Sequence, residues 1–101
     1  MMDRKTLREA ILTRLSTVVD PETRADVVHM RLVEDLMVDE TGAVRYKFRP
    51  SSPLCPLAVS LALSIREAVE QVEGVTGQTI EVVGYVGAAE LNAMLRELEV
   101  E

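Results

Sequence analysis

Cysteine and histidine are almost missing from this sequence, since Cys55 and His29 are the only examples in 101 residues. A single cysteine excludes an internal disulfide framework and fits a protein of the reducing cytoplasm. The chain also lacks a Cys-x-x-Cys pair, a second histidine to share a metal, and a glycine-rich phosphate loop. A Cys–His nucleophile pair would need His29 beside Cys55, and nothing in the sequence places it there.

Basic residues are scarce in the second half of the chain, and long apolar runs are absent throughout. Residues 51–101 carry eight acidic and two basic residues, and the net charge of the chain is −6. This distribution argues against nucleic-acid binding, which needs clustered lysine and arginine. No run approaches the ~20 apolar residues of a membrane span, and the charged N-terminus is unlike a signal peptide. We therefore expect a single cytoplasmic domain over residues 1–101, with no nucleic-acid or membrane partner.

Hydrophobic periodicity predicts three helices and three or four strands. We expect helices at residues 4–19, 56–72 and 88–98, and strands at 27–38 (one strand, or two broken near Arg31), 43–49 and 79–86. Residues 39–42 form the turn of a hairpin in which Val38 pairs with Val44 and Asp35 faces Lys47. A Thr6-x-x-Glu9 capping box, or Asp3 in its place, starts the first helix. This order predicts an α+β fold, a two-layer α/β sandwich whose small mixed sheet of three to four strands is covered by helices on one face.

The segment around Cys55 is the strongest candidate for chemistry. Pro56 is expected at the first position of the helix at 56–72, which places Cys55 at or next to the N-cap. Free backbone N–H groups and the helix dipole would lower the pKa of the thiol there. The alternative is that Cys55 is a small buried apolar residue of the core. Asp20 and Glu22, around Pro21, are either a helix-capping turn or a pair of carboxylates near the reactive site.

The motifs Asp20-Pro21-Glu22 and Ser52-Pro53-x-Cys55-Pro56, separated by a Leu32-Val33 strand and a hairpin, resemble those of the SufT/PaaD-like family. The resemblance runs from about Asp20 to Val83, and it implies a small α/β fold and a part in assembling or delivering iron–sulfur clusters. By this resemblance Asp20 and Glu22 are the family's acidic pair, Cys55 its reactive cysteine, and Ser51 stands where a threonine is usual. Arg31 and Leu54 stand where the family commonly has glycine.

These observations predict an accessory protein, not an enzyme, that uses Cys55 as a transient thiolate ligand of iron or an iron–sulfur cluster. Asp20, Glu22 and Ser51 would support that site, and the partners would be iron–sulfur assembly or recipient proteins. Two alternatives stay open: a non-catalytic adaptor of the same fold, and a thiol-dependent enzyme with Cys55 as nucleophile. Because Leu57, Val59 and Leu63 widen the apolar face of the helix at 56–72, we also expect a homodimer or a partner-binding surface at its start.

Overall fold

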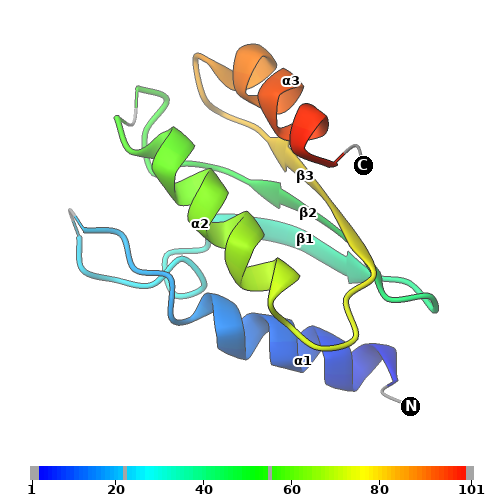
Figure 1. Cartoon of the computed structure of the whole chain (residues 1–101). Coiled ribbons are helices and arrows are strands. Elements are labelled where there is room, and N and C mark those ends of the chain that lie inside the picture. The colour runs from blue at the N-terminus through cyan, green and yellow to red at the C-terminus, as the bar shows by residue number, and fades with distance from the viewer. Residues whose placement is uncertain (1–2, 22, 55, 100–101) are drawn as a thin grey trace.

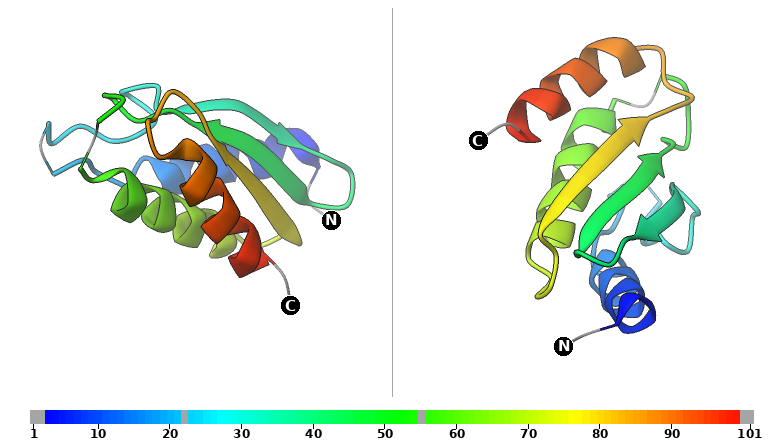
Figure 2. Two further views of the ribbon diagram at one scale, coloured as in Figure 1. Left: turned by 90° about the horizontal axis from the view of Figure 1, so that it is seen from above. Right: turned by 90° about the vertical axis from the view of Figure 1, so that its right-hand side faces the viewer.

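The three strands form one mixed sheet in the order β1–β2–β3, and α2 packs across one face of it (Figures 1 and 2). The structure is a computed structural model that describes residues 3–21, 23–54 and 56–99. Along the chain the elements are α1 (Arg4–Leu15), β1 (Val33–Val38), β2 (Ala43–Phe48), α2 (Ala58–Glu70), β3 (Gly77–Val82) and α3 (Ala88–Glu99). Helix α1 lies beside β1 and α3 beside β3 (Figure 2). The predicted α+β sandwich is confirmed.

Helix α1 is shorter than the sequence predicts. It begins at an N-cap made by Asp3, whose side chain accepts a 2.7 Å hydrogen bond from the Thr6 N–H, so Asp3 rather than a capping box starts the helix. That bond holds the pKa of Asp3 below its ordinary value. The helix ends at Leu15, because Val18 and Val19 leave it: the Val18 carbonyl accepts from the Val27 N–H, and Val19 forms an isolated bridge with Asp26. The predicted end at residue 19 is therefore wrong.

The hairpin of β1 and β2 contains a bulge. Val38 pairs with Val44 as predicted, but Glu34, not Asp35, stands opposite Lys47, because the register shifts by one residue between Glu34 and Met37. Asp35 has a positive φ of 52° at this point. A bulge inserts one extra residue and turns its neighbours, so two consecutive carboxylates reach basic side chains: Asp35 reaches Lys47 of β2, and Glu34 reaches Arg49 just after β2.

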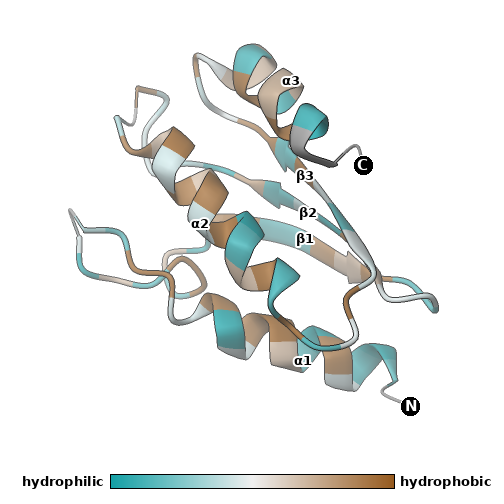
Figure 3. Cartoon of the chain, in the orientation of Figure 1, coloured by the Kyte–Doolittle hydropathy of each residue, from teal (hydrophilic) through white to brown (hydrophobic). Residues whose placement is uncertain are grey.

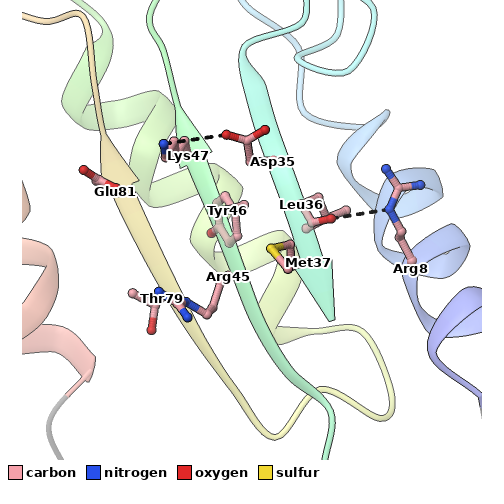
Figure 4. A pocket seen from close by; sticks show the side chains of 9 residues that line it. All are labelled: Arg8, Asp35, Leu36, Met37, Arg45, Tyr46, Lys47, Thr79 and Glu81. Atoms are coloured by element: carbon pink, nitrogen blue, oxygen red, sulfur yellow. Dashed lines mark hydrogen bonds and ion pairs between the residues drawn. The ribbon is translucent and has the colours of Figure 1, made fainter. Parts of the chain in front are cut away.

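The connection from β2 through α2 to β3 makes those two strands parallel. Helix α2 starts at Ala58 and ends at Glu70, two residues inside the predicted 56–72 at each end, and β3 ends at Val82 rather than at residue 86. The sheet side chains that face the helices are buried: Val44, Tyr46, Phe48, Ile80 and Val82. The other face is polar and open, and Figure 4 shows Arg45, Lys47, Thr79 and Glu81 on it.

Both edges of the sheet carry side chains from the flanking helices. At the β1 edge, Arg8 Nε of α1 donates to the Leu36 carbonyl at 3.5 Å (Figure 4). At the β3 edge, the Asn92 side chain of α3 accepts from the Val82 N–H at 2.7 Å and donates to the Val82 carbonyl at 3.0 Å. Asn92 thus takes the hydrogen bonds that a fourth strand would make with Val82.

Candidate functional site

Three loops gather at the end of the molecule away from the N-terminus (Figure 1). They are residues 16–32 between α1 and β1, 49–57 between β2 and α2, and 83–87 between β3 and α3. Because β2 and β3 are parallel, their carboxyl ends lie side by side, and ligands commonly bind outside the carboxyl ends of such strands. This end therefore holds both motifs that the sequence singled out.

Backbone hydrogen bonds hold these loops together. The Arg49 N–H donates to the Leu32 carbonyl at 2.7 Å, which joins the first two loops. The Val83 N–H donates to the Phe48 carbonyl at 2.9 Å, and the Val86 N–H to the Pro53 carbonyl at 2.9 Å. The loop that carries the cysteine is thus tied to both of its neighbours.

The start of α2 corrects one prediction about the cysteine. Leu57 is the N-cap, with φ −100° and ψ 6° and no side-chain cap, and the first helical residue is Ala58. Pro56 therefore does not occupy the first helical position, and Cys55 precedes the helix by three positions rather than capping it. Cys55 itself lies outside the described residues, as does Glu22. On either side of the cysteine, Leu54 and Pro56 are exposed, Leu54 by 73%.

The two serines of this loop differ. Ser52 Oγ accepts a hydrogen bond from the Leu54 N–H at 3.2 Å, a short turn made by a serine side chain. Ser51 is exposed, and the structure records no such bond for it among the described residues. Ser52 therefore makes a local backbone contact just before the cysteine.

Asp20 is buried, with 1% of its surface exposed. Its N–H donates to the Ala25 carbonyl at 3.0 Å and its carbonyl accepts from the Arg24 N–H at 2.7 Å, so the chain turns sharply after it. Arg24 has a positive φ of 61° in this turn. Asp20 therefore belongs to the interior of the loop, although the sequence could not distinguish a surface carboxylate from a buried one.

Arg31 closes a turn that normally needs glycine. The Leu32 N–H donates to the Val27 carbonyl and the Arg31 N–H to the Val28 carbonyl, the bond pair of a Schellman motif. Arg31 has the left-handed conformation of that motif, with φ 60°. Arg31, which stands where the family commonly has glycine, therefore occupies a strained backbone position.

Replacing Arg31 by glycine is expected to raise the free energy of unfolding by about 0.5–1 kcal/mol. The left-handed conformation costs a residue with a Cβ atom about 1–2 kcal/mol, and the extra entropy of unfolded glycine returns about 0.5–1 kcal/mol of that. Urea denaturation would measure the change. Arg31→Ala is the control, since alanine removes the charge but keeps the strain. A gain of the same size in Arg31→Ala would contradict this explanation.

Arg49 is a residue of this end that the sequence analysis did not single out. Its Nε contacts Glu34 Oε2 at 2.7 Å, and its side chain lies against Gly84, where a Cβ atom would come within 2.6 Å of Nη1. Arg49 thus joins β1 to the loop after β3. The sequence places Arg49 at the end of the predicted strand at 43–49. Its pairing with Glu34 could not be predicted, because it depends on the bulge in β1.

Two features of the described residues bear on the predicted function. In the part of the chain that the structure describes, no group of three or more His, Cys, Asp and Glu side chains is placed to hold a metal ion. Within the same residues, no helix has the length and apolar character to cross a membrane.

Comparison with known proteins points to one family. The model of a family described as "Iron-sulfur cluster assembly protein" matches residues 8–82. The chain is 37% identical over 92 residues to an uncharacterized protein of Methanocaldococcus jannaschii, covering 91% of this chain and 97% of that one. It is 32% identical over 77 residues to an Fe-S protein maturation auxiliary factor of Bacillus subtilis, covering 76% of each. A conserved hypothetical protein of Thermotoga maritima has the same fold, with a TM-score of 0.67, 28% identity and 97% of each chain covered.

Proposed function

Because the chain belongs to the family of iron–sulfur cluster assembly proteins, we propose that it is a cytosolic accessory protein in iron–sulfur cluster assembly or transfer. Its partners are assembly proteins that supply the cluster and recipient proteins that receive it. The match over residues 8–82 is the observation that carries this proposal, since it includes both the Asp20 turn and the Cys55 loop. The similarity to a maturation auxiliary factor supports the same role.

Cys55 is the proposed ligand. Thiolates are the soft ligands that iron and iron–sulfur clusters prefer, and a cluster commonly takes four of them. One thiol per chain can supply a single bond, which suits a cluster that is cargo on its way to a recipient rather than one that the protein keeps. Cys55 precedes the first helical residue by three positions, and the helix dipole acts only within the first turn. The proposal therefore does not rely on the helix dipole to form the thiolate. Iron itself displaces the proton when it binds the sulfur.

The remaining site residues have supporting roles in this proposal. Asp20, at 1% exposure, holds the turn of residues 20–25 and so positions the neighbouring loops, instead of offering an oxygen to a ligand from solution. Ser52 orders the approach to the cysteine through its bond to the Leu54 N–H. Ser51, exposed in the same loop, and Glu22 keep the supporting role that the family resemblance implies.

Anaerobic reconstitution with iron and sulfide tests the proposal. The wild-type protein should bind iron and show visible absorption, and Cys55→Ser should bind iron at least about tenfold more weakly, since even the loss of an outer-shell partner costs 10–100-fold. Thr13→Ser is the matched control, because it also introduces a serine and Thr13 is exposed on α1, outside the three loops. Equal iron binding by the wild type and Cys55→Ser would disprove the ligand role.

The two alternatives predict different results. An adaptor of the same fold should support cluster enzymes in cells equally well with Cys55→Ser. A thiol-dependent enzyme would need a base that activates Cys55. The rate at which Cys55 is alkylated should then change with pH as that base titrates. A homodimer through the start of α2 is also part of the proposal.

A further inference from the structure

Arg49 stands where the three loops of the candidate site meet. It is the first residue of the loop at 49–57, which we call the cysteine loop. Its N–H donates to the carbonyl of Leu32, the last residue of the first loop, at 2.7 Å. Its Nε contacts Glu34 Oε2 at 2.7 Å, in the strand that follows, and its side chain lies against Gly84 of the loop after β3. One residue thus touches all three loops.

The contact between Arg49 and Gly84 is close. A Cβ atom at Gly84 would lie 2.6 Å from Arg49 Nη1 and 3.3 Å from Arg49 Cγ, so both the stem and the guanidinium group cover this glycine. Gly84 also has a positive φ of 64°, a conformation that is costly for a residue with a Cβ atom. Glycine at this position therefore provides both the turn and the space in which the Arg49 side chain lies.

The loop after β3 bonds the cysteine loop a second time. The Val86 N–H donates to the Pro53 carbonyl at 2.9 Å, two residues before the cysteine. Gly84 in turn comes two residues before Val86, so the same short loop contacts the cysteine loop at its first residue, Arg49, and again at Pro53. If the Arg49 side chain leaves Gly84, we expect the chain between Gly84 and Val86 to move more freely, and the bond to Pro53 to open more often.

Prolines make the cysteine loop stiff. Pro50, Pro53 and Pro56 are three of the eight residues from 49 to 56, and the ring of each fixes φ near −65°. A stiff segment transmits a displacement along the chain because it has few free dihedral angles to absorb it. We therefore expect the approach to Cys55 to follow the contacts that hold this loop to its neighbour.

After Arg49 the chain offers no further charge near the cysteine. Residues 50–65 contain no charged side chain, in a chain in which 28% of the residues are charged. Figure 3 shows apolar colouring on the first half of α2, which follows this loop, and hydrophilic colouring farther along. Arg49 is therefore the nearest charged residue before Cys55 in the sequence, and its ion pair with Glu34 supplies an ionic anchor at the start of the cysteine loop.

The ion pair of Arg49 differs from an ordinary surface contact. Exposed pairs contribute little to stability, and the side chains of Arg49 and Glu34 are 53% and 34% exposed. Their contact of 2.7 Å is nevertheless closer than the 3.6 Å between Lys47 and Asp35, and the Arg49 side chain also packs on Gly84. We therefore expect Arg49 to affect the local position of the loop more than the stability of the whole domain.

We propose that Arg49 is a positioning residue for the cysteine loop. Held by Glu34 and lying over Gly84, its side chain fixes the loop after β3, and that loop holds Pro53 before the cysteine. The inference rests on the proposed function of Cys55, because a thiol binds iron more tightly when its loop is already in place. Arg49 acts on the thiol through the backbone and needs no contact with the iron.

Amide exchange of Val86, followed by NMR in the iron-free protein, tests the positioning. Arg49→Ala should speed the exchange of the Val86 N–H by about fivefold or more, the effect of losing one well-formed surface pair. Arg45→Ala is the matched control, because Arg45 is exposed on the same face of β2 (Figure 4) and makes no ion pair within the described residues. It should leave the exchange of Val86 as in the wild type.

A double-mutant cycle tests whether Gly84 acts through Arg49. Gly84→Ala adds a Cβ atom that displaces the Arg49 side chain, so it should speed the exchange of Val86 in the wild-type background. In the Arg49→Ala background that side chain is already gone, and the same substitution should have an effect at least about twofold smaller. The cost of the positive φ is common to both backgrounds and cancels in the comparison.

Iron binding measures the consequence for the site. Under the anaerobic conditions that compare the wild type with Cys55→Ser, Arg49→Ala should bind iron about two- to thirtyfold more weakly, the usual range for a residue that acts without touching the ligand. Arg45→Ala should bind iron like the wild type. Both arginine variants should unfold at similar urea concentrations, so the difference in affinity reports the loop and not global unfolding.

Four results would overturn the proposal. The first is an exchange rate of Val86 that Arg49→Ala leaves unchanged, or that Arg45→Ala raises equally. The second is an equal effect of Gly84→Ala in both backgrounds. The third is faster exchange in Arg49→Ala with unchanged iron affinity. The fourth is a much larger loss of stability in Arg49→Ala than in Arg45→Ala, which would indicate a purely structural role.

The exchange experiment needs no iron, so its failure leaves the proposed cluster role standing. If the wild type and Cys55→Ser bind iron equally, the proposed function fails, and the exchange of Val86 still decides whether Arg49 positions the cysteine loop.

Discussion

Gly42→Ala should lower the free energy of unfolding by about 2–5 kcal/mol, a large part of the 5–15 kcal/mol that stabilises an ordinary domain. Gly42 ends the turn between β1 and β2 with φ 90°, a conformation that costs other residues about 1–2 kcal/mol. A Cβ atom there would also lie 2.3 Å from the Gly74 carbonyl oxygen. Since that oxygen belongs to the backbone, relief requires a backbone shift, and overpacking of this kind costs about 1–3 kcal/mol.

The same turn is held from both sides, so it cannot yield easily. The Thr76 N–H donates to the Gly42 carbonyl at 3.0 Å, and the Thr76 hydroxyl donates to the Thr41 carbonyl at 3.0 Å. Gly77→Ala is the matched control, because an added Cβ at Gly77 meets nothing within 4 Å. Urea denaturation of both variants measures the difference, and a similar loss in Gly77→Ala would show that the close contact at Gly42 is not the cause.

Phe48→Ala should cost about 3–5 kcal/mol, the range found when a buried phenylalanine is truncated. Phe48 is fully buried at the end of the central strand β2, and its carbonyl accepts the Val83 N–H that ties the loop after β3 to the sheet. The cavity would therefore form directly beneath the loops that carry the candidate site. We expect lower thermal stability and faster amide exchange in residues 83–87 than in α1.

Phe48→Leu separates cavity formation from loss of the aromatic ring. Leucine keeps most of the apolar contact and leaves a smaller cavity than alanine, so we expect a smaller loss of stability than in Phe48→Ala. Denaturation by urea, with hydrogen exchange on the same samples, reports both effects. If exchange in residues 83–87 rises no more than in α1, the Val83–Phe48 bond does not couple this loop to the core.

Sequence patterns predicted the order of helices and strands because, within most segments, the apolar residues follow either the helical or the strand period. Leu7, Ile11 and Leu15 are buried at helical spacing, and Val44, Tyr46 and Phe48 at strand spacing. The end of α1 was wrong because Val18 and Val19 continue the helical spacing, while their actual partners, Val27 and Asp26, come later in the chain. The shifted register of β1 was also invisible, because a bulge at Asp35 leaves the alternation of neighbouring residues almost unchanged.

The candidate site was predictable in its motifs and less so in its geometry. The sequence brought attention to the Asp20 turn and the Cys55 loop, and their loops do lie at one end of the molecule. It placed the start of α2 too early, since a proline suits the first helical position but equally suits the turn before it. Asp20 is buried beside a turn that backbone bonds to residues 24 and 25 close, and no spacing rule describes such a turn.

The side chains at the two sheet edges have a consequence for how the protein avoids aggregation. An uncovered edge strand recruits strands from other molecules, which leads to amyloid-like growth. Here the Arg8 side chain of α1 donates to the Leu36 carbonyl. The Asn92 side-chain amide of α3 bonds both the N–H and the carbonyl of Val82. An extended peptide that tried to add to either strand would have to displace these side chains first. The sheet of this protein is therefore closed to intruding strands, and its contacts with other proteins are confined to side-chain surfaces that can separate again.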